Sequence, residues 1–146
     1  MENASKPCEL CDNLGGILLW ESHDCRVVRV KDADYPGFCR VIWNAHVREM
    51  TDLSSDQRRS IMDIVFGVEQ VIRELFSPYK INLASFGNMT PHLHWHVIPR
   101  WSDDRHFPEP IWGNVHQNQT LKRHCVSDET IAQRLNQFFL RDLNHG

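Results

Sequence analysis

The chain lacks a long hydrophobic run, an export signal and an excess of positive charge. No stretch of its 146 residues is apolar for long enough to cross a bilayer. The first residues also lack the charged-then-apolar order of a signal peptide. With 16 Lys and Arg against 19 Asp and Glu, the net charge is −3, which argues against a nucleic-acid binder driven by bulk positive charge. We therefore expect a cytoplasmic protein that binds no membrane and no nucleic acid.

The features of a disulfide scaffold and of a Walker-type phosphate loop are missing as well. The five cysteines are an odd number in a chain without an export signal. Cys25 and Cys39 lie in apolar, strand-like runs, so we expect buried thiols there. Gly15-Gly16 is not followed by Gly-Lys-Ser/Thr. Length and a hydrophobic content of 41% predict one domain over residues 1–146.

Short β-branched runs and two amphipathic segments predict an α+β fold. The runs that are typical of strands are residues 17–20, 25–30, 38–43, 81–86 and 93–99. The first three are joined by short polar turns that leave no room for a crossover helix. This favours antiparallel pairing.

The amphipathic segments predict one long helix and a C-terminal helix. Apolar residues recur at steps of three and four from Ile61 to Leu75, behind a capping box formed by Ser54 and Gln57. Ser77-Pro78 ends this helix. Residues 101–126 are expected to form a loop, and Ser127 can cap a last helix with Ile131, Leu135 and Phe138 or Phe139 on its apolar face.

Three histidines at alternate positions of one predicted strand carry most of the functional information. On a strand they point one way, and the apolar residues between them point the other way, into the core. A His-rich, solvent-facing strand edge would explain one such residue better than three. Two functional interpretations remain: a metal site, or nucleophilic and acid–base catalysis at phosphorus by neutral imidazole. The three residues are His92, His94 and His96.

The motif His92-Leu93-His94-Trp95-His96-Val97-Ile98 resembles the signature of the histidine triad (HIT) family, in which three histidines alternate with apolar residues. Its context is similar too: a Cys-x-x-Cys pair near the start, a Tyr-Pro-Gly turn, and a histidine before the long helix. The resemblance covers about residues 8–100, most like the bacterial diadenosine-polyphosphate-hydrolase-like branch, and leaves 101–146 as a C-terminal extension. It implies an antiparallel half-barrel sheet of about five strands and a homodimer.

The resemblance also implies a nucleotide hydrolase or nucleotidyl transferase. Such an enzyme cleaves at the α-phosphate of a dinucleoside polyphosphate such as diadenosine tetraphosphate. His94, the middle histidine, would be the nucleophile that forms a covalent nucleotidyl-imidazole intermediate, which water then hydrolyses. His96 would donate to a non-bridging oxygen. His92 would orient the network or serve a metal.

Candidate nucleotide contacts lie on two turns. Asn88 and Thr90, just ahead of the triad, can reach the phosphate with an amide and with a hydroxyl or backbone N–H. Asp32 is the candidate that would contact the ribose, with Asp34 as the alternative. Both aspartates are equally consistent with ordinary turn residues.

A structural zinc ion is implied by the resemblance at Cys8, Cys11, His46 and His92. A Cys₂His₂ set is closed, so it would tie the N-terminal segment to the sheet and leave two histidines for chemistry. The alternative is a reduced, idle thiol pair with His46 as a strand-end cap. Whether Mg²⁺ accompanies the substrate stays open.

Two other functions remain open at this point. The first is hydrolysis of nucleoside phosphoramidates by the same chemistry, because the leaving group decides between the two and residues 101–146 set its pocket. The second is a nucleotide-binding regulatory protein with little turnover, which a missing middle histidine would favour. In the extension, four residues either shape the leaving-group pocket or belong to a surface loop: His106, His116, His124 and Trp112.

Overall fold

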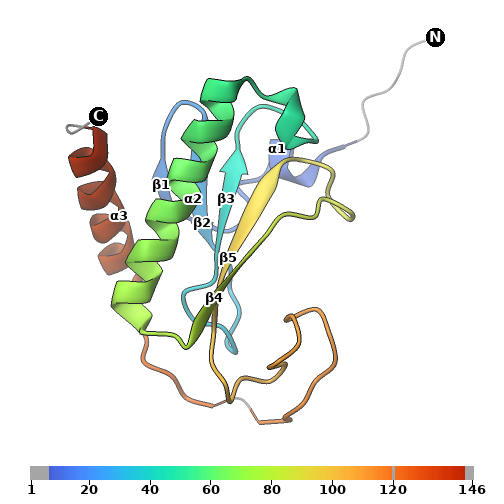
Figure 1. Cartoon of the computed structure of the whole chain (residues 1–146), viewed down its shortest axis with the longest axis vertical. Coiled ribbons are helices and arrows are strands. Elements are labelled where there is room, and N and C mark those ends of the chain that lie inside the picture. Colours follow the sequence, from blue (N-terminus) through green and yellow to red (C-terminus); the bar gives the residue numbers. More distant parts are fainter. Residues whose placement is uncertain (1–6, 120, 144–146) are drawn as a thin grey trace.

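Five antiparallel strands form one open sheet in the computed structural model, which describes residues 7–119 and 121–143 (Figure 1). The strands are β1 (Ile17–Glu21), β2 (Cys25–Arg29), β3 (Cys39–Trp43), β4 (Lys80–Ala84) and β5 (His94–Arg100). Their order across the sheet is β1-β2-β3-β5-β4. The predicted α+β class and the antiparallel pairing are confirmed, with small shifts at the strand ends.

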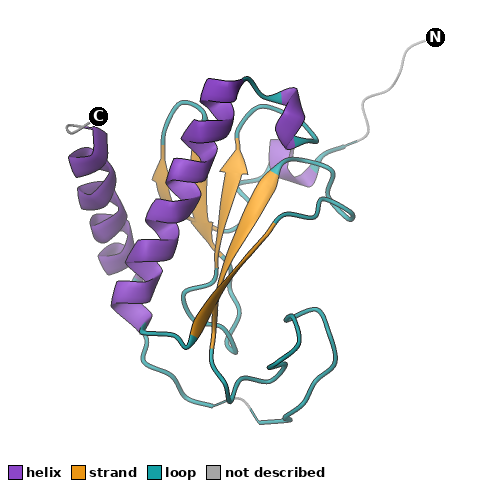
Figure 2. Ribbon diagram, in the orientation of Figure 1, coloured by secondary structure: helices purple, strands orange, loops and turns teal. Residues whose placement is uncertain are grey.

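The two long helices lie together on one face of this sheet (Figure 2). They are α2 (Ser55–Phe76) and α3 (Asp128–Leu143). A short helix α1 (Glu9–Asp12) and a 3₁₀ helix (Met50–Asp52) lie elsewhere. Helix α2 packs on β3 and β5, and α3 packs on β1 and α2. No helix in the described ranges is long and apolar enough to cross a membrane.

Local sequence signals explain where the two long helices begin and end. The capping box of Ser54 and Gln57 is present at the start of α2, and Ser77 ends that helix in the left-handed conformation before Pro78. The Ser127 hydroxyl accepts a hydrogen bond from the Thr130 backbone N–H at 3.2 Å, which caps α3 as predicted. The described residues between β5 and α3 form neither helix nor strand, which confirms the predicted loop.

The two faces of the sheet bury different residues. On the helix face, alternate strand residues join the side chains of α2 and α3 in the main hydrophobic core, which includes the buried thiols of Cys25 and Cys39. On the other face, Val28 and Ile42 form a smaller cluster with Leu10 of the N-terminal segment. The period of two along each strand separates these sets. The second face carries the polar residues that matter for function.

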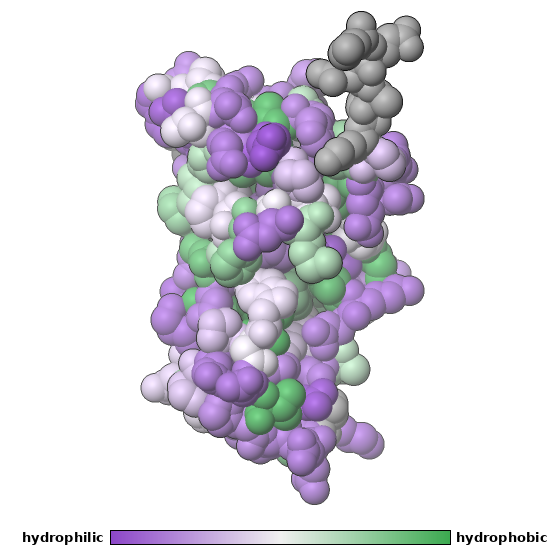
Figure 3. Space-filling view, turned by 90° about the vertical axis from the view of Figure 1, so that its right-hand side faces the viewer, coloured by the Kyte–Doolittle hydropathy of each residue, from purple (hydrophilic) through white to green (hydrophobic). Residues whose placement is uncertain are grey.

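One side of the molecular surface is mixed in character. On the face drawn in Figure 3, apolar side chains form separate patches between hydrophilic ones. Several of the most exposed apolar side chains belong instead to one cavity, which is described next.

Candidate active site and metal centre

Strand β5 places two of the three triad histidines next to each other on the face of the sheet that the helices leave open. The ring centroids of His94 and His96 lie 4.9 Å apart, and the residues are only 7% and 6% exposed. Leu93 and Val97 point to the opposite face and join the main core. Within β5 the alternation is as predicted, and it brings two imidazoles to a shared site. His92 lies before the strand begins, so the prediction that all three histidines lie on one strand is wrong for His92.

The backbone fixes the tautomer of His94. Its Nδ1 lies 2.5 Å from the carbonyl oxygen of His92, and a carbonyl only accepts, so Nδ1 carries the proton and donates it. Nε2 is left with a free lone pair. Burial lowers the pKa of His94, the bond to His92 opposes this, and the positive charge of Arg40 lowers it further. His94 is therefore a neutral imidazole with one nucleophilic nitrogen.

His96 is held neutral by an apolar surrounding. Burial, followed by the neighbouring His94 and Arg40, lowers its pKa to about 3. Aromatic rings surround it, with centroids 5.8 Å away for Phe38, 6.4 Å for Phe86 and 5.0 Å for Trp112. A neutral ring carries one N–H, and His96 Nδ1 has no partner in the described structure. His96 can therefore donate one hydrogen bond to a ligand without bringing a charge.

A cavity of about 420 Å³ opens in front of these two rings; we call it the histidine cavity. Three apolar side chains at its rim, Phe86, Met89 and Trp112, are 58%, 97% and 53% exposed. Exposed apolar groups that gather at one cavity indicate a binding site rather than a random surface. The lining consists of Glu9, Leu10, Arg40, Phe86, Gly87, Asn88, Met89, Thr90, His94, His96 and Trp112.

The predicted nucleotide contacts do not all lie at this cavity. Asn88 and Thr90 line it, on the loop that leads into the triad. Asp32 does not line it: its Oδ1 accepts from the backbone N–H of Asp34 at 3.0 Å, which is an ordinary turn contact. Asp34 forms an ion pair with Arg105 instead. The contact between Asp32 and the ribose thus stays a prediction, because Asp32 is not among the residues that line the cavity.

His92 turns its ring away from the histidine cavity. Its Nε2 donates to the carbonyl oxygen of Trp43 at 2.6 Å, and the residue is fully buried. The carbonyl of Trp43 therefore fixes the tautomer and leaves Nδ1 free as a ligand atom. His92 thus has two separate tasks, since its backbone orients His94 and its ring faces a different cluster.

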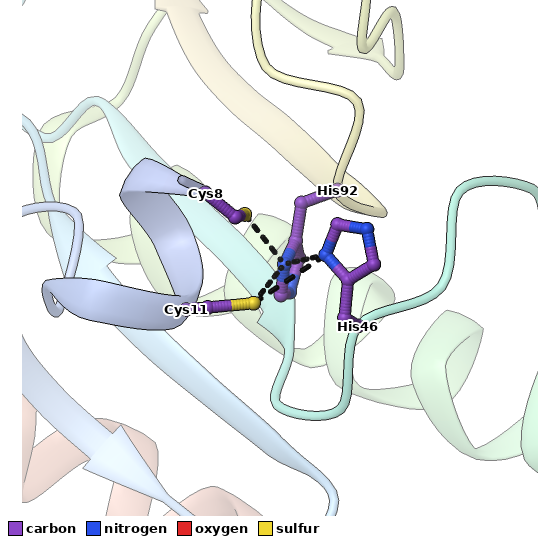
Figure 4. A group of neighbouring side chains, drawn as sticks. All are labelled: Cys8, Cys11, His46 and His92. Carbon is purple, nitrogen blue, oxygen red and sulfur yellow. Dashed lines mark hydrogen bonds between the residues drawn. The ribbon is translucent and has the colours of Figure 1, made fainter. Parts of the chain in front are cut away.

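That cluster consists of four potential metal ligands from three separate segments (Figure 4). The ligand atoms of Cys8, Cys11, His46 and His92 all lie within 4.8 Å of one another. His92 Nδ1 lies 3.4 Å from Cys8 Sγ, 3.5 Å from Cys11 Sγ and 3.3 Å from His46 Nδ1. In a tetrahedral zinc site, Zn–S bonds of about 2.3 Å and Zn–N bonds of about 2.0–2.1 Å place ligand atoms about 3.3–3.8 Å apart. The four residues therefore form a possible metal site.

Local structure explains why these ligands meet. The N–H of Cys11 donates to the carbonyl of Cys8, so α1 turns both thiols to one side. After β3, Val47 accepts from the N–H of Leu93, and Trp43 donates to the carbonyl of Leu93. This extra pairing holds the segment with His46 next to the residue before β5.

The loop after β5 returns to the histidine cavity because Arg100 anchors it. The guanidinium of Arg100 binds both carboxylate oxygens of buried Asp104, and its Nη2 donates to the carbonyl of Glu109 at 2.7 Å. A turn follows directly, in which Gly113 N–H donates to Pro110 O at 2.8 Å. Trp112 lies in this turn and is thereby placed against His96.

Sequence reasoning missed Arg40 and left Trp112 undecided. A charged residue in the middle of the apolar run of β3 was the available signal for Arg40, because one strand residue in two faces away from the core. Trp112 had no comparable signal. Its position depends on contacts between a loop and the end of a strand, which no local pattern records.

Comparison of the sequence with known proteins agrees with the resemblance that the histidine motif carries. Residues 15–103 match the profile of a family described as HIT domain. An AP-4-A phosphorylase from Mycobacterium tuberculosis is 29% identical over 106 residues, which are 67% of this chain and 54% of that protein. An asymmetrical bis(5′-nucleosyl)-tetraphosphatase from Schizosaccharomyces pombe is 28% identical over 89 residues, covering 58% of this chain and 49% of that one. The chain thus spans about half the length of the curated relatives it matches.

Solved structures share the fold at low sequence identity. A histidine triad protein from Bradyrhizobium japonicum superimposes with a TM-score of 0.67 at 24% identity, covering 85% of this chain and 90% of the other. A zinc-bound histidine triad family protein from Mycobacterium smegmatis does so with a TM-score of 0.60 at 16% identity, covering 95% and 97%.

Proposed function

This chain belongs to the histidine triad (HIT) family, and on that premise we propose that it is a nucleotide hydrolase or nucleotidyl transferase acting at the α-phosphate of dinucleoside polyphosphates. The observation that carries the proposal is the hydrogen bond from His94 Nδ1 to the carbonyl of His92 at 2.5 Å. It leaves Nε2 as the one nucleophilic nitrogen of a neutral ring that lines a cavity.

The proposed reaction has two displacements. In the first, His94 Nε2 attacks the α-phosphorus, a P–N bond forms, and the P–O bond to the leaving phosphate breaks with its electron pair. The nucleotidyl-imidazole now carries a positive charge, which the carbonyl of His92 stabilises through the Nδ1 proton. In the second, water attacks phosphorus, the P–N bond breaks, and the nucleoside monophosphate leaves with one proton released.

Neutral donors around the cavity suit the charge that develops on the phosphoryl oxygens. His96 can donate its single N–H, and Asn88 and Thr90 supply an amide and a hydroxyl at the same cavity. The exposed rings of Phe86 and Trp112 at the rim offer a surface for a planar base. A contact of Asp32 with the ribose and a Mg²⁺ ion with the substrate stay predictions.

The relatives' names support the substrate class. The two curated relatives are named for diadenosine tetraphosphate and for a bis(5′-nucleosyl) tetraphosphate. Because the chain covers only about half of each, their activities enter here as a proposal. Hydrolysis of phosphoramidates and a regulatory role with little turnover are the competing functions. A cytoplasmic location and a homodimer stay predictions.

We also infer that Cys8, Cys11, His46 and His92 hold a structural zinc ion. Two cysteine thiols and two imidazole nitrogens suit zinc, and four of their ligand-atom pairs lie 3.3–3.5 Å apart, which is within tetrahedral spacing. A solved protein of the same fold is zinc-bound. The ion would join α1 to the segment before β5 and so support the carbonyl that orients His94.

Intact-protein mass spectrometry after acid-free quenching with diadenosine tetraphosphate tests the catalytic proposal. We expect a species one adenylyl group heavier for the wild type, and none for His94→Ala or His94→Gly. His23→Ala is the matched control, because that side chain is 99% exposed and lies outside the cavity lining. Absence of both adduct and turnover in the wild type would favour the regulatory role.

A further inference from the structure

Arg40 lies in the wall of the histidine cavity with most of its hydrogen-bonding capacity unused. It is the second residue of β3 and lies directly opposite His96 in the strand register. A guanidinium has five N–H donors. Within the described ranges, one of them is used: Nη1 donates to the carbonyl of Gly15 at 2.9 Å. Its buried Nε has no partner at all. Such unused donors are unfavourable unless a ligand or water accepts from them.

Arg40 is half-buried, and two fully buried arginines show what a purely structural guanidinium looks like in this fold. Arg26, on the neighbouring strand β2, donates to four protein acceptors: Leu14 O, Asn44 Oδ1, Leu10 O and Asn13 O. Arg100 is equally well satisfied, with Asp104 as its ion-pair partner. Arg40 differs from both, which indicates that its partner is not part of the described protein.

Charge points to the same conclusion. Arg40 is the one Lys or Arg side chain among the residues that line the cavity, and Glu9 is the one carboxylate. The charge of Glu9 acts on Arg40 from a distance, but none of the ion pairs among the described residues joins the two. A permanently charged guanidinium therefore faces the cavity without a counter-ion, next to the proposed nucleophile.

We propose that Arg40 binds the phosphate chain beyond the attacked phosphorus and thereby selects phosphate leaving groups over amine leaving groups. This inference rests on the proposed function. Arg40 and His94 are diagonal neighbours on one face of paired strands, about 7–8 Å apart at the backbone. A long side chain can bridge that distance. The two ends of the guanidinium fork suit phosphate oxygens.

The selectivity follows from where the electron pair goes. When the P–O bond to a polyphosphate breaks, its electron pair adds negative charge to the leaving phosphate, and Arg40 stabilises that charge. When the P–N bond of a phosphoramidate breaks, the nitrogen takes up a proton from solvent water and leaves as a neutral amine or ammonia. Arg40 then has no developing anion to stabilise.

Two substrates that share the transferred adenylyl group test the proposal: diadenosine tetraphosphate and adenosine 5′-phosphoramidate. We expect Arg40→Gln to lower kcat/KM for the first about 10- to 100-fold, and for the second by less than about 3-fold. Arg40→Lys should recover part of the loss, since it keeps the charge but not the fork. Arg59→Gln is the matched control, because it removes the same charge from an exposed position on α2.

A second measurement separates binding from folding and from turnover. Isothermal titration with inorganic tripolyphosphate should show binding to the wild type and to Arg59→Gln, and at least about 10-fold weaker binding to Arg40→Gln. Melting temperatures of all variants report whether the bond to Gly15 is needed for folding. Equal losses of kcat/KM for both substrates, or equal tripolyphosphate affinity with and without Arg40, would overturn the proposal.

Failure of the proposed function gives a different result. If the wild type turns over neither substrate, the catalytic proposal is wrong, and the titration still decides about Arg40. If the wild type hydrolyses diadenosine tetraphosphate and Arg40→Gln does so equally well, the enzyme is as proposed and Arg40 only anchors the loop of Gly15.

Discussion

The indole ring of Trp112 lies 5.0 Å from the imidazole of His96, measured between ring centroids, at an interplanar angle of 66°. Trp112 also makes an edge contact with Phe86 at 5.0 Å. The loop after β5 therefore completes the cavity that the sheet and the preceding loop begin. The triad strand supplies two imidazoles to this cavity, and the loop beyond it supplies an aromatic wall.

We expect Trp112→Ala to lower kcat/KM for diadenosine tetraphosphate about 5- to 100-fold. Stacking of one base on an aromatic side chain is worth about 1–3 kcal/mol. Trp112→Phe should retain most of the activity, because a smaller ring still offers a flat face. Initial-rate kinetics at equal zinc content measure the effect.

Phe66→Ala is the control for this variant, since Phe66 is similarly exposed at 51% but lies on α2, away from the cavity. Unchanged kinetics in Trp112→Ala would show that the aromatic wall does not contact the substrate.

Local periodicity explains how much of the fold could be predicted from the sequence. The alternation around His94 and the helical spacing from Ile61 to Leu75 each depend on neighbours within a few residues, and the structure contains both. The capping residue Ser54 is local in the same sense. Such features survive folding because tertiary packing uses the faces that they define.

Contacts between distant segments set the limit of that prediction. Cys8 Sγ and His92 Nδ1 are in contact although the two residues are 84 positions apart in the sequence. Only the family resemblance predicted that they belong to one site. The role of Arg100 in returning the loop to His96 had no local signature at all. Asp32 shows a different limit, because a turn aspartate has the same sequence pattern whether it faces a ligand or its own backbone.

The possible metal site predicts a zinc-dependent fold. We expect the Cys8→Ser, Cys11→Ser double variant to lose one bound zinc ion per chain and to lose more than about 3 kcal/mol of unfolding free energy, because zinc binds the folded site much more tightly than the unfolded chain. Elemental analysis and urea unfolding measure the two effects.

Cys125→Ser is the matched control, as Cys125 is an exposed free thiol outside the cluster. A double variant with wild-type stability, or a wild type purified in zinc-containing buffer without bound metal, would contradict the zinc assignment.

The buried pair of Arg100 and Asp104 predicts an acid-sensitive contribution to stability. Burial alone would raise the pKa of Asp104, but hydrogen bonds from Arg100 and from the N–H groups of Trp101, His106 and Phe107 outweigh it and lower the pKa to about 2. A carboxyl with a depressed folded-state pKa stabilises the protein above its unfolded pKa of about 3.9. That contribution, about 2 kcal/mol, is lost as the pH falls from about 4 to 2.

Asp104→Asn should therefore be less stable than the wild type by about 3 kcal/mol at pH 7, with the difference shrinking below pH 4. Urea unfolding of both proteins at pH 7, 4 and 2.5 measures this difference, and any metal at the Cys8, Cys11, His46 and His92 cluster would be released by acid from both proteins alike. Asp103→Asn, whose side chain is 59% exposed in its pair with Arg123, should change stability by less than about 1 kcal/mol. A constant difference at all three pH values would disprove the linkage.

The docking of α3 on α2 depends on a glycine in the middle of a helix. A Cβ atom on Gly67 would lie 2.9 Å from the ring of Phe138 and closer still to the ring of Phe139. Phe139 is 4% exposed and packs against Trp20 at 4.5 Å between ring centroids, so it has little room to move.

Replacing Gly by Ala in a helix usually stabilises it by about 1 kcal/mol. Here we expect Gly67→Ala to destabilise the protein by about 1–3 kcal/mol, because overpacking outweighs propensity. Ser60→Ala, exposed on the same helix, should be neutral or slightly stabilising in the same urea measurement. A Gly67→Ala protein as stable as Ser60→Ala would mean that α3 does not hold this position against α2.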